Sequence, residues 1–340
     1  MASTLHRDAD LVDAHNDLLG LVVRRPRGEQ AAYFRSRWLS QLRDGGVDVQ
    51  VLALFTGRDD LHELLLMLEA GHRVAAANAD AVAICLTGAD VDAALAAGKI
   101  ALILALEGCG ALRGEVAILE TLFRLGVRMV SFTHMGRTAF ADGSAEDSTG
   151  SGLTRAGIEA LGVAEELGML MDVSHLSASG VDDVLARATR PVVASHSSAF
   201  SLLAHHRNLT DDRLRAIAAS GGVVGVNFMA GFVDPDRPTV ERLVDHVLHV
   251  ASVAGAGHVG LGPDFIEEYA LETYVGDLVI EGVSMKQAIP GLGGPTGLPL
   301  VTDAIVARGV PEDEIRAILG GNWLRVLRAE LGVPAGARRP

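Results

Sequence analysis

Residues 168–196 read GMLMDVSHLSASGVDDVLARATRPVVASH. Two short apolar runs, at 170–174 and 191–195, each end directly before a histidine, and a stretch with helical period lies between them at 177–188. A short buried strand, a helix and a second short strand in this order are typical of a parallel βαβ unit. Such a unit brings His175 and His196 to the carboxyl ends of neighbouring strands.

The same pattern recurs along the whole chain. We predict strands at residues 11–15, 47–54, 100–106, 127–133, 170–174, 191–195, 222–228 and 258–262. Helical stretches are predicted near 60–80, 115–125, 154–168, 177–188, 210–220, 239–254 and 312–331, with Ser177 starting one of them and Gly168 ending another. Strands that are apolar throughout and alternate with helices indicate a parallel sheet covered on its faces.

Eight such units predict an α/β protein with one catalytic domain over residues 1–340, a (β/α)8 TIM barrel. The ends, 1–8 and 333–340, are expected to be flexible. A doubly wound open sheet is the structural alternative.

Composition excludes several partners. The formal net charge of -14 argues against nucleic acid and anionic membrane surfaces, which attract basic faces. The apolar runs are too short to span a membrane. The first residues lack the apolar segment of a secretory signal, the last ones lack a lipid-anchor signal, and there are two cysteines, Cys85 and Cys109. We therefore expect a cytoplasmic protein with reduced cysteines.

Polar side chains follow the predicted strands at the end where a barrel carries its active site. These residues are His15, Asp17, Glu107, His134, His175, His196 and Asp264. Burying so many polar and charged groups together is unfavourable unless something pairs them, and divalent cations would do so. Imidazole and carboxylate ligands together suit zinc.

The order of these residues suggests two metal positions. His15 and Asp17 project to the same side of an extended chain and form one ligand pair, while His175 and His196 form the other. Glu107 can bridge two ions through its two oxygens. Two zinc ions bridged in this way would share a hydroxide that is available at neutral pH.

Three residues remain for the reaction itself. Asp264 is the expected acid/base, and His134 is expected to hydrogen-bond a developing oxyanion. Arg207 could bind a substrate carboxylate through two hydrogen bonds, but a surface arginine near Asp211 or Asp212 is an equal alternative from sequence alone.

Other candidates have ordinary interpretations. His246 and His249 lie three apart on an amphipathic helix and are predicted to be solvated. Cys109 is expected to be a small buried hydrophobe. A serine-hydrolase site around Ser195 is disfavoured because Gly-x-Ser-x-Gly is missing.

Together these residues resemble the renal (membrane) dipeptidase family of zinc peptidases in the amidohydrolase superfamily. The likeness extends from about residue 10 to 330. Its motifs, in order, are Asp13-Ala-His15-Asn-Asp17-Leu18, Ala105-Leu-Glu107-Gly108, Ser131-Phe-Thr-His134, Asp172-Val-Ser-His175-Leu-Ser177, Pro191-Val-Val-Ala-Ser195-His196, Arg207-Asn208-Leu, Gly221-Gly222-Val-Val-Gly-Val-Asn227-Phe228, His258-Val-Gly-Leu-Gly-Pro-Asp264-Phe265 and Gly320-Gly321-Asn322-Trp323.

The resemblance implies a TIM barrel and hydrolysis of dipeptides, including those with a D-residue at the second position. It assigns the zinc ligands as above, with His15 and Asp17 on one ion, His175 and His196 on the other, and Glu107 between them. It further implies that Arg207 binds the carboxylate of the substrate. Relatives are often dimers, so a homodimer is expected.

The sequence departs from the family at two places. After His134 many relatives carry Trp or Pro-Trp before an Ala-Asp pair, whereas this chain has Gly136-Arg137-Thr-Ala-Phe140-Ala-Asp142. Ile266-Glu267-Glu268 follows Phe265 where mammalian members have Asp-Gly. Side-chain preference therefore stays open. Two other functions stay open too: a binuclear metal amidohydrolase acting on another amide, lactone or ester, and a catalytically inactive metal-binding protein.

Overall fold

The computed structural model describes residues 4–57, 59–273, 279–280 and 283–334. Each of the eight predicted strands has a counterpart in it. The strands are β1 (Val12–Asn16), β2 (Val49–Phe55), β3 (Val82–Ile84), β4 (Ile100–Glu107), β5 (Val127–Ser131), β6 (Leu170–Asp172), β7 (Val192–Val193), β8 (Val224–Val226), β9 (Val259–Leu261), β10 (Val279–Ile280) and β11 (Val283–Ser284).

The main sheet is parallel and curls as half a barrel. Its strand order is β1-β2-β4-β5-β6-β7, while β8 and β9 form a separate parallel pair. β2 and β4 stay in register from Val49 opposite Ala101 to Phe55 opposite Glu107. All of β4 is buried, as expected for an apolar strand covered on both faces.

Backbone contacts connect the two sheets. Ala194, after β7, forms a parallel bridge with Val224 of β8. The amide of Asp264, after β9, donates to the carbonyl of His15 at the end of β1 over 3.1 Å. The first and last predicted strands therefore lie beside one another.

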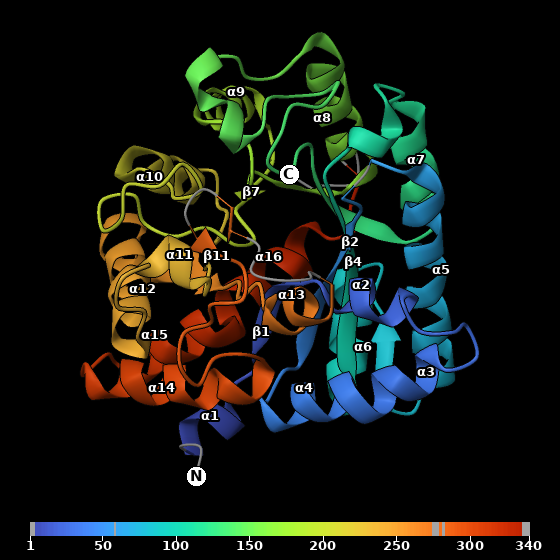
Figure 1. Cartoon of the computed structure of the whole chain (residues 1–340). Helices are drawn as coiled ribbons and strands as arrows, with labels where there is room; N and C mark the ends of the chain where they lie inside the picture. Colours follow the sequence, from blue (N-terminus) through green and yellow to red (C-terminus); the bar gives the residue numbers. More distant parts are fainter. Residues whose placement is uncertain (1–3, 58, 274–278, 281–282, 335–340) are drawn as a thin grey trace.

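Helices surround these strands (Figure 1). They are α1 (Thr4–Asp8), α2 (Leu18–Val23), α3 (Gln30–Tyr33), α4 (Ser40–Asp44), α5 (Leu61–Ala77), α6 (Gly88–Ala96), α7 (Ala117–Arg124), α8 (Arg155–Leu167), α9 (Ala178–Arg187), α10 (Asp211–Ala219), α11 (Ala230–Val233), α12 (Val240–Ala254), α13 (Glu267–Thr273), α14 (Leu298–Ala307), α15 (Glu312–Arg316) and α16 (Asn322–Glu330).

Local chemistry sets the helix ends in the βαβ unit. The Ser177 hydroxyl accepts from the amide of Gly180 and caps α9, as predicted. Gly168 ends α8 with a φ of 84°, a left-handed conformation that favours glycine.

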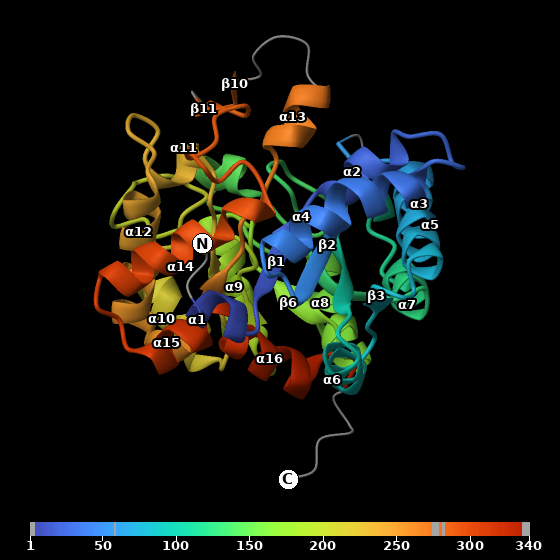
Figure 2. The same cartoon turned by 90° about the horizontal axis from the view of Figure 1, so that it is seen from below.

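Some elements were not predicted. The short strand β3 pairs with the first residues of β4, from Ile100, before β5 joins that strand at Leu104. β10 and β11 pair antiparallel and lie beyond the main sheet near α13 (Figure 2).

The chain ends were expected to be flexible. Residues 4–8 form helix α1, in which His6 is buried and its ring nitrogens contact the Thr302 hydroxyl and the Gly45 carbonyl. Residues 1–3 and 335–340 lie outside the described residues.

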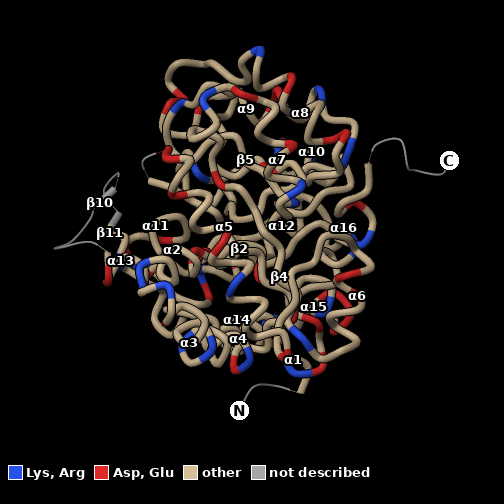
Figure 3. The backbone as a smooth tube through the Cα atoms, turned by 90° about the vertical axis from the view of Figure 1, so that its right-hand side faces the viewer, with Lys and Arg blue, Asp and Glu red and all other residues tan. Residues whose placement is uncertain are grey.

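Acidic and basic residues are interspersed over the outer helices (Figure 3). In the described part of the chain, no helix combines the length and apolarity needed to cross a membrane.

Candidate metal centre and substrate pocket

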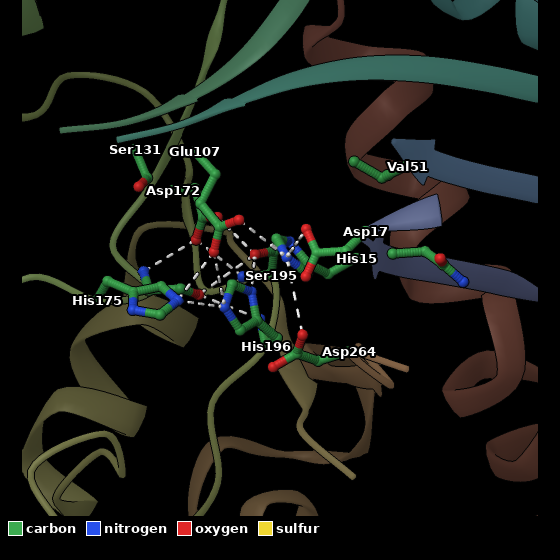
Figure 4. A network of polar contacts seen from close by, with 12 residues as sticks. His15, Asp17, Val51, Glu107, Ser131, Asp172, His175, Ser195, His196 and Asp264 are labelled. Carbon is green, nitrogen blue, oxygen red and sulfur yellow. Dashed lines mark hydrogen bonds and ion pairs between the residues drawn. The ribbon is translucent and has the colours of Figure 1, made fainter. Parts of the chain in front are cut away.

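The predicted site residues meet at the carboxyl ends of the strands (Figure 4). His15 lies in β1 with Asp17 directly after it, and Glu107 ends β4. His175, His196 and Asp264 follow β6, β7 and β9. Residues far apart in the sequence thus form one buried cluster, as a parallel α/β sheet predicts.

Glu107 lies at the centre of the cluster. Its Oε2 is 3.3 Å from Nε2 of His15, and its Oε1 is 2.9 Å from Nε2 of His175 and 3.5 Å from Nε2 of His196. Burial alone would raise the pKa of Glu107, but the nearby His15 and His175 hold it well below its usual range. This carboxylate therefore faces both predicted ligand pairs, one with each oxygen.

His175 and His196 form the imidazole half of the site. Their Nε2 atoms are 2.7 Å apart, and burial lowers the pKa of both rings, with further lowering by Arg207. The Ser195 hydroxyl donates to Asp172, so its oxygen accepts a hydrogen bond from the Nδ1–H group of His196, 2.7 Å away. The lone pair of His196 therefore lies on Nε2, which faces the centre.

His15, Asp17 and Asp264 form the acidic half. The Nε2 atom of His15 is 4.0 Å from Oδ1 of Asp17 and 4.0 Å from Oδ1 of Asp264. Burial would lower the pKa of His15, but Glu107 and the two aspartates raise it to about 10. Burial, helped by the Glu107 charge, raises the pKa of Asp17 and of Asp264.

These groups fit divalent cations. Nε2 of His15 and Oδ1 of Asp17 are buried and lack a hydrogen-bond partner among the described residues. Ligand atoms lie within 4.8 Å of one another in three sets: His15, Glu107 and His196; Glu107, His134 and His175; His15, Asp17 and Asp264. Imidazole nitrogens and carboxylate oxygens at such spacing are the ligands that zinc prefers.

A second layer of side chains orients the ligands. Asp13 accepts from the amide of His15 over 3.0 Å, and Asn227 donates to Oδ2 of Asp264 over 2.9 Å. His175 and Asp264 adopt φ values of 71° and 57°, a conformation that is strained for these residues and that the surrounding contacts must hold. The sequence pattern assigns no role to Asn227, Asp172 or Ser195.

His134 lies in the cluster beside His175, with ring centroids 4.3 Å apart, and against Phe55 at 4.4 Å. Burial lowers its pKa to about 4. The neutral ring keeps one N–H that can donate to a substrate.

Arg207 is buried, which rules out the surface alternative. Its Nη2 atom is 3.1 Å from Nε2 of His175 and donates to the carbonyl of His196 over 3.3 Å. Asp211 instead contacts His249 and Ser201, and Asp212 pairs with Arg215.

One minor prediction was wrong. His246 is not solvated: it is buried between the amide of Ala199 and the carbonyl of Val233. His246 lies on the face of α12 that packs against the protein interior. Cys109 is buried as expected, and burial raises the pKa of its thiol.

A pocket opens over the cluster. Its polar part is formed by Asp17, Glu107, His134, His175 and Asp264, and the other lining residues are Phe55, Met135, His205, Met229, Phe232, Ile266, Tyr269 and Met285. The second group comes from the end of β2, from α11 and α13 and from loops. Of these residues, Ile266 lies in a segment where the sequence departs from the family.

Two solved structures have a similar fold. A metallopeptidase of family M19, dipeptidase AC, superposes with a TM-score of 0.83 at 26% identity, covering 95% of this chain and 99% of the other. A metallopeptidase from Rhodobacter sphaeroides, liganded with a phosphinate mimic of the dipeptide L-Ala-D-Ala, gives 0.82 at 26% identity, with 95% and 99% coverage.

Two curated relatives that are similar in sequence carry the name dipeptidase. Dipeptidase verJ from Clonostachys rogersoniana is 31% identical over 79% of this chain, and an uncharacterized dipeptidase from Schizosaccharomyces pombe is 36% identical over 67%. These alignments span 65% and 53% of the relatives' own lengths. The family model described as membrane dipeptidase, peptidase family M19, matches residues 1–333. The chain therefore belongs to the membrane dipeptidase family.

Proposed function

We propose that this protein is a zinc-dependent dipeptidase that hydrolyses the single peptide bond of a dipeptide with a free carboxylate. Family membership and the dipeptidase names of its relatives support this activity. The phosphinate mimic of L-Ala-D-Ala in a solved neighbour supports extending it to dipeptides with a D-residue in second position.

The position of Glu107 carries the proposal most directly. Its two oxygens face His15 on one side and His175 and His196 on the other, all within 3.5 Å. This arrangement suits a carboxylate shared by two ions, with His15 and Asp17 holding one and His175 and His196 the other. Two zinc ions held in this way would supply a water of lowered pKa and polarise the scissile carbonyl.

Asp264 is positioned to move the proton. Its Oδ1 faces the centre near His15, while Asn227 holds Oδ2. Because burial raises the pKa of Asp264, this carboxyl can take a proton from the attacking water and release it to the leaving amine.

His134 and Arg207 are assigned to the substrate. The neutral His134 ring would donate to the oxyanion that develops from the scissile carbonyl. Arg207, whose guanidinium is next to His175, would bind the substrate carboxylate and so limit cleavage to short peptides.

We further propose that β8 and β9 complete a (β/α)8 barrel as one catalytic domain. The bridge between Ala194 and Val224 and the contact between Asp264 and His15 support this closure. The homodimer and the cytoplasmic location stay predictions.

Metal analysis combined with a dipeptide panel tests the function. Protein expressed with zinc should hold close to two equivalents and hydrolyse L,L- and L,D-dipeptides, and chelation should abolish turnover. Less than one equivalent of zinc together with no turnover of any dipeptide would refute the proposal. Activity on lactones or cyclic amides alone would favour the broader amidohydrolase alternative.

A further inference from the structure

The pocket has two unlike surfaces. Its polar floor holds the metal-ligand candidates, whereas most of the remaining lining is hydrocarbon or thioether. We call the following residues the apolar wall: Phe55, Met135, Met229, Phe232, Ile266 and Met285. None of the described lining residues is a lysine or an arginine.

The apolar wall is assembled from a strand end, the short helix α11 and several loops. Phe55 ends β2, Met229 precedes α11, and Met285 follows β11. Three of its six members are methionines, whose flexible, polarizable side chains pack against apolar groups of varied shape. Such a surface can bind large apolar groups of different shapes.

Arg207 fixes which end of a dipeptide meets this wall. It does not line the pocket but lines a neighbouring one, and among the described lining residues only His175 belongs to both. A dipeptide with its carboxylate at Arg207 and its scissile bond over Glu107 must extend its amino-terminal residue away from Arg207. Phe232 lies at the Arg207 side of the wall, with its ring centroid 5.5 Å from Cζ of Arg207. The amino-terminal residue would instead face the part of the wall beside Asp264, which Ile266 follows by two residues.

We propose that the apolar wall selects dipeptides whose amino-terminal residue has a large apolar side chain, such as Leu, Met or Phe. This inference rests on the dipeptidase function proposed above. An acidic side chain at this position would meet Asp17 and Asp264 with no cationic side chain in the pocket to pair with, and a lysine side chain would lose its hydration against the wall.

A panel of Xaa-Gly dipeptides tests the selection. We expect kcat/KM for Leu-Gly and Met-Gly to be about tenfold higher than kcat/KM for Ala-Gly. The same two substrates should exceed Asp-Gly in kcat/KM about a hundredfold. The kcat/KM for Gly-Leu should be close to that for Gly-Ala. Equal rates across the panel, or a preference for Gly-Leu over Leu-Gly, would overturn the inference and leave the dipeptidase function intact; no hydrolysis of any member would refute the function itself.

A charge placed in the wall gives a second test. Met285→Glu should lower the ratio of kcat/KM for Leu-Gly to that for Lys-Gly about tenfold or more, because the new carboxylate would pair with the lysine. The matched control is Leu271→Glu on α13, where the side chain is 58% exposed and outside the pocket. The ratio should stay unchanged there.

Zinc content and melting temperature establish that each variant is folded. If Met285→Glu fails to bind zinc, Ile266→Glu replaces it, with the same ratio as the readout. An unchanged ratio in a folded, zinc-loaded wall variant would contradict the selection.

Discussion

The two halves of the candidate metal site differ in what would hold a metal ion in each of them. In the acidic half, His15 is surrounded by Glu107, Asp17 and Asp264, and charge attracts a cation. In the imidazole half, His175 and His196 are neutral and next to the cationic Arg207. The acidic half should therefore bind its ion more tightly, while the other half depends on the orientation of its rings.

Glu107→Gln should have the largest effect because both halves share this carboxylate. We expect zinc content to fall to one equivalent or less and kcat/KM to fall about 10⁴-fold or more. Elemental analysis and steady-state kinetics measure these. Glu120→Gln is the control, since Glu120 lies on α7 and, among the residues that the structure describes, forms its ion pair with exposed Arg124. Full zinc occupancy in the Glu107 variant would mean that the halves are independent.

Asp264→Asn separates proton transfer from metal binding in the acidic half. We expect kcat to fall by about 10²- to 10⁴-fold while at least one equivalent of zinc stays, because His15, Asp17 and Glu107 remain. Kinetics on zinc-loaded protein check this. A variant that keeps its rate would exclude Asp264 as the acid/base.

Arg207→Ala probes the cation beside the imidazole half. Loss of a charged hydrogen bond to the substrate should raise KM for a dipeptide by about 10- to 100-fold with a smaller change in kcat. For a dipeptide amide, which lacks the carboxylate, KM should rise much less in this variant. Equal losses for both substrates would show that Arg207 acts on His175 rather than on the substrate.

Ser195→Ala tests whether orientation holds the imidazole half. Without the Ser195 hydroxyl, Nδ1 of His196 loses its partner, and the weaker zinc affinity should fall about 10- to 100-fold while the tighter one is kept. Competition with a chelator measures both constants. Ser36→Ala, on the exposed surface, should change neither. Equal weakening of both ions would remove the distinction between the halves.

Proton release on metal binding gives the smallest signal. The pKa of His15 is raised to about 10, so below that pH the ring is protonated in the metal-free protein and zinc must displace the proton. His175 and His196, whose pKa values are lowered, have none to lose at pH 7. Calorimetry in buffers of different ionisation enthalpy should find at least one proton released with the tighter ion and close to none with the weaker. The tighter affinity should rise from pH 6 to 9.

The sequence predicted the floor of the site better than its wall. His15, Glu107 and His175 lie at or just after the ends of apolar strands. The geometry of a parallel sheet brings these strand ends together, independently of the loop conformations. The supporting roles of Asn227 and Ser195 were not predicted, because the hydrophobic periodicity of a sequence does not reveal side-chain hydrogen bonds between different strands. Met229 and Met285 were missed because loop conformation, not pattern, decides which side chains face a pocket.

The contact between Asp264 and His15 also concerns the order in which the protein is made. His15 and Asp17 leave the ribosome first, Glu107 follows, and the imidazole pair comes later. Asp264 is synthesised only after most of the chain, and its amide then donates to the carbonyl of His15. A nascent chain would therefore lack the proposed acid/base in its place until the residues after β9 dock on β1, so the proposed activity would begin only when synthesis is nearly finished.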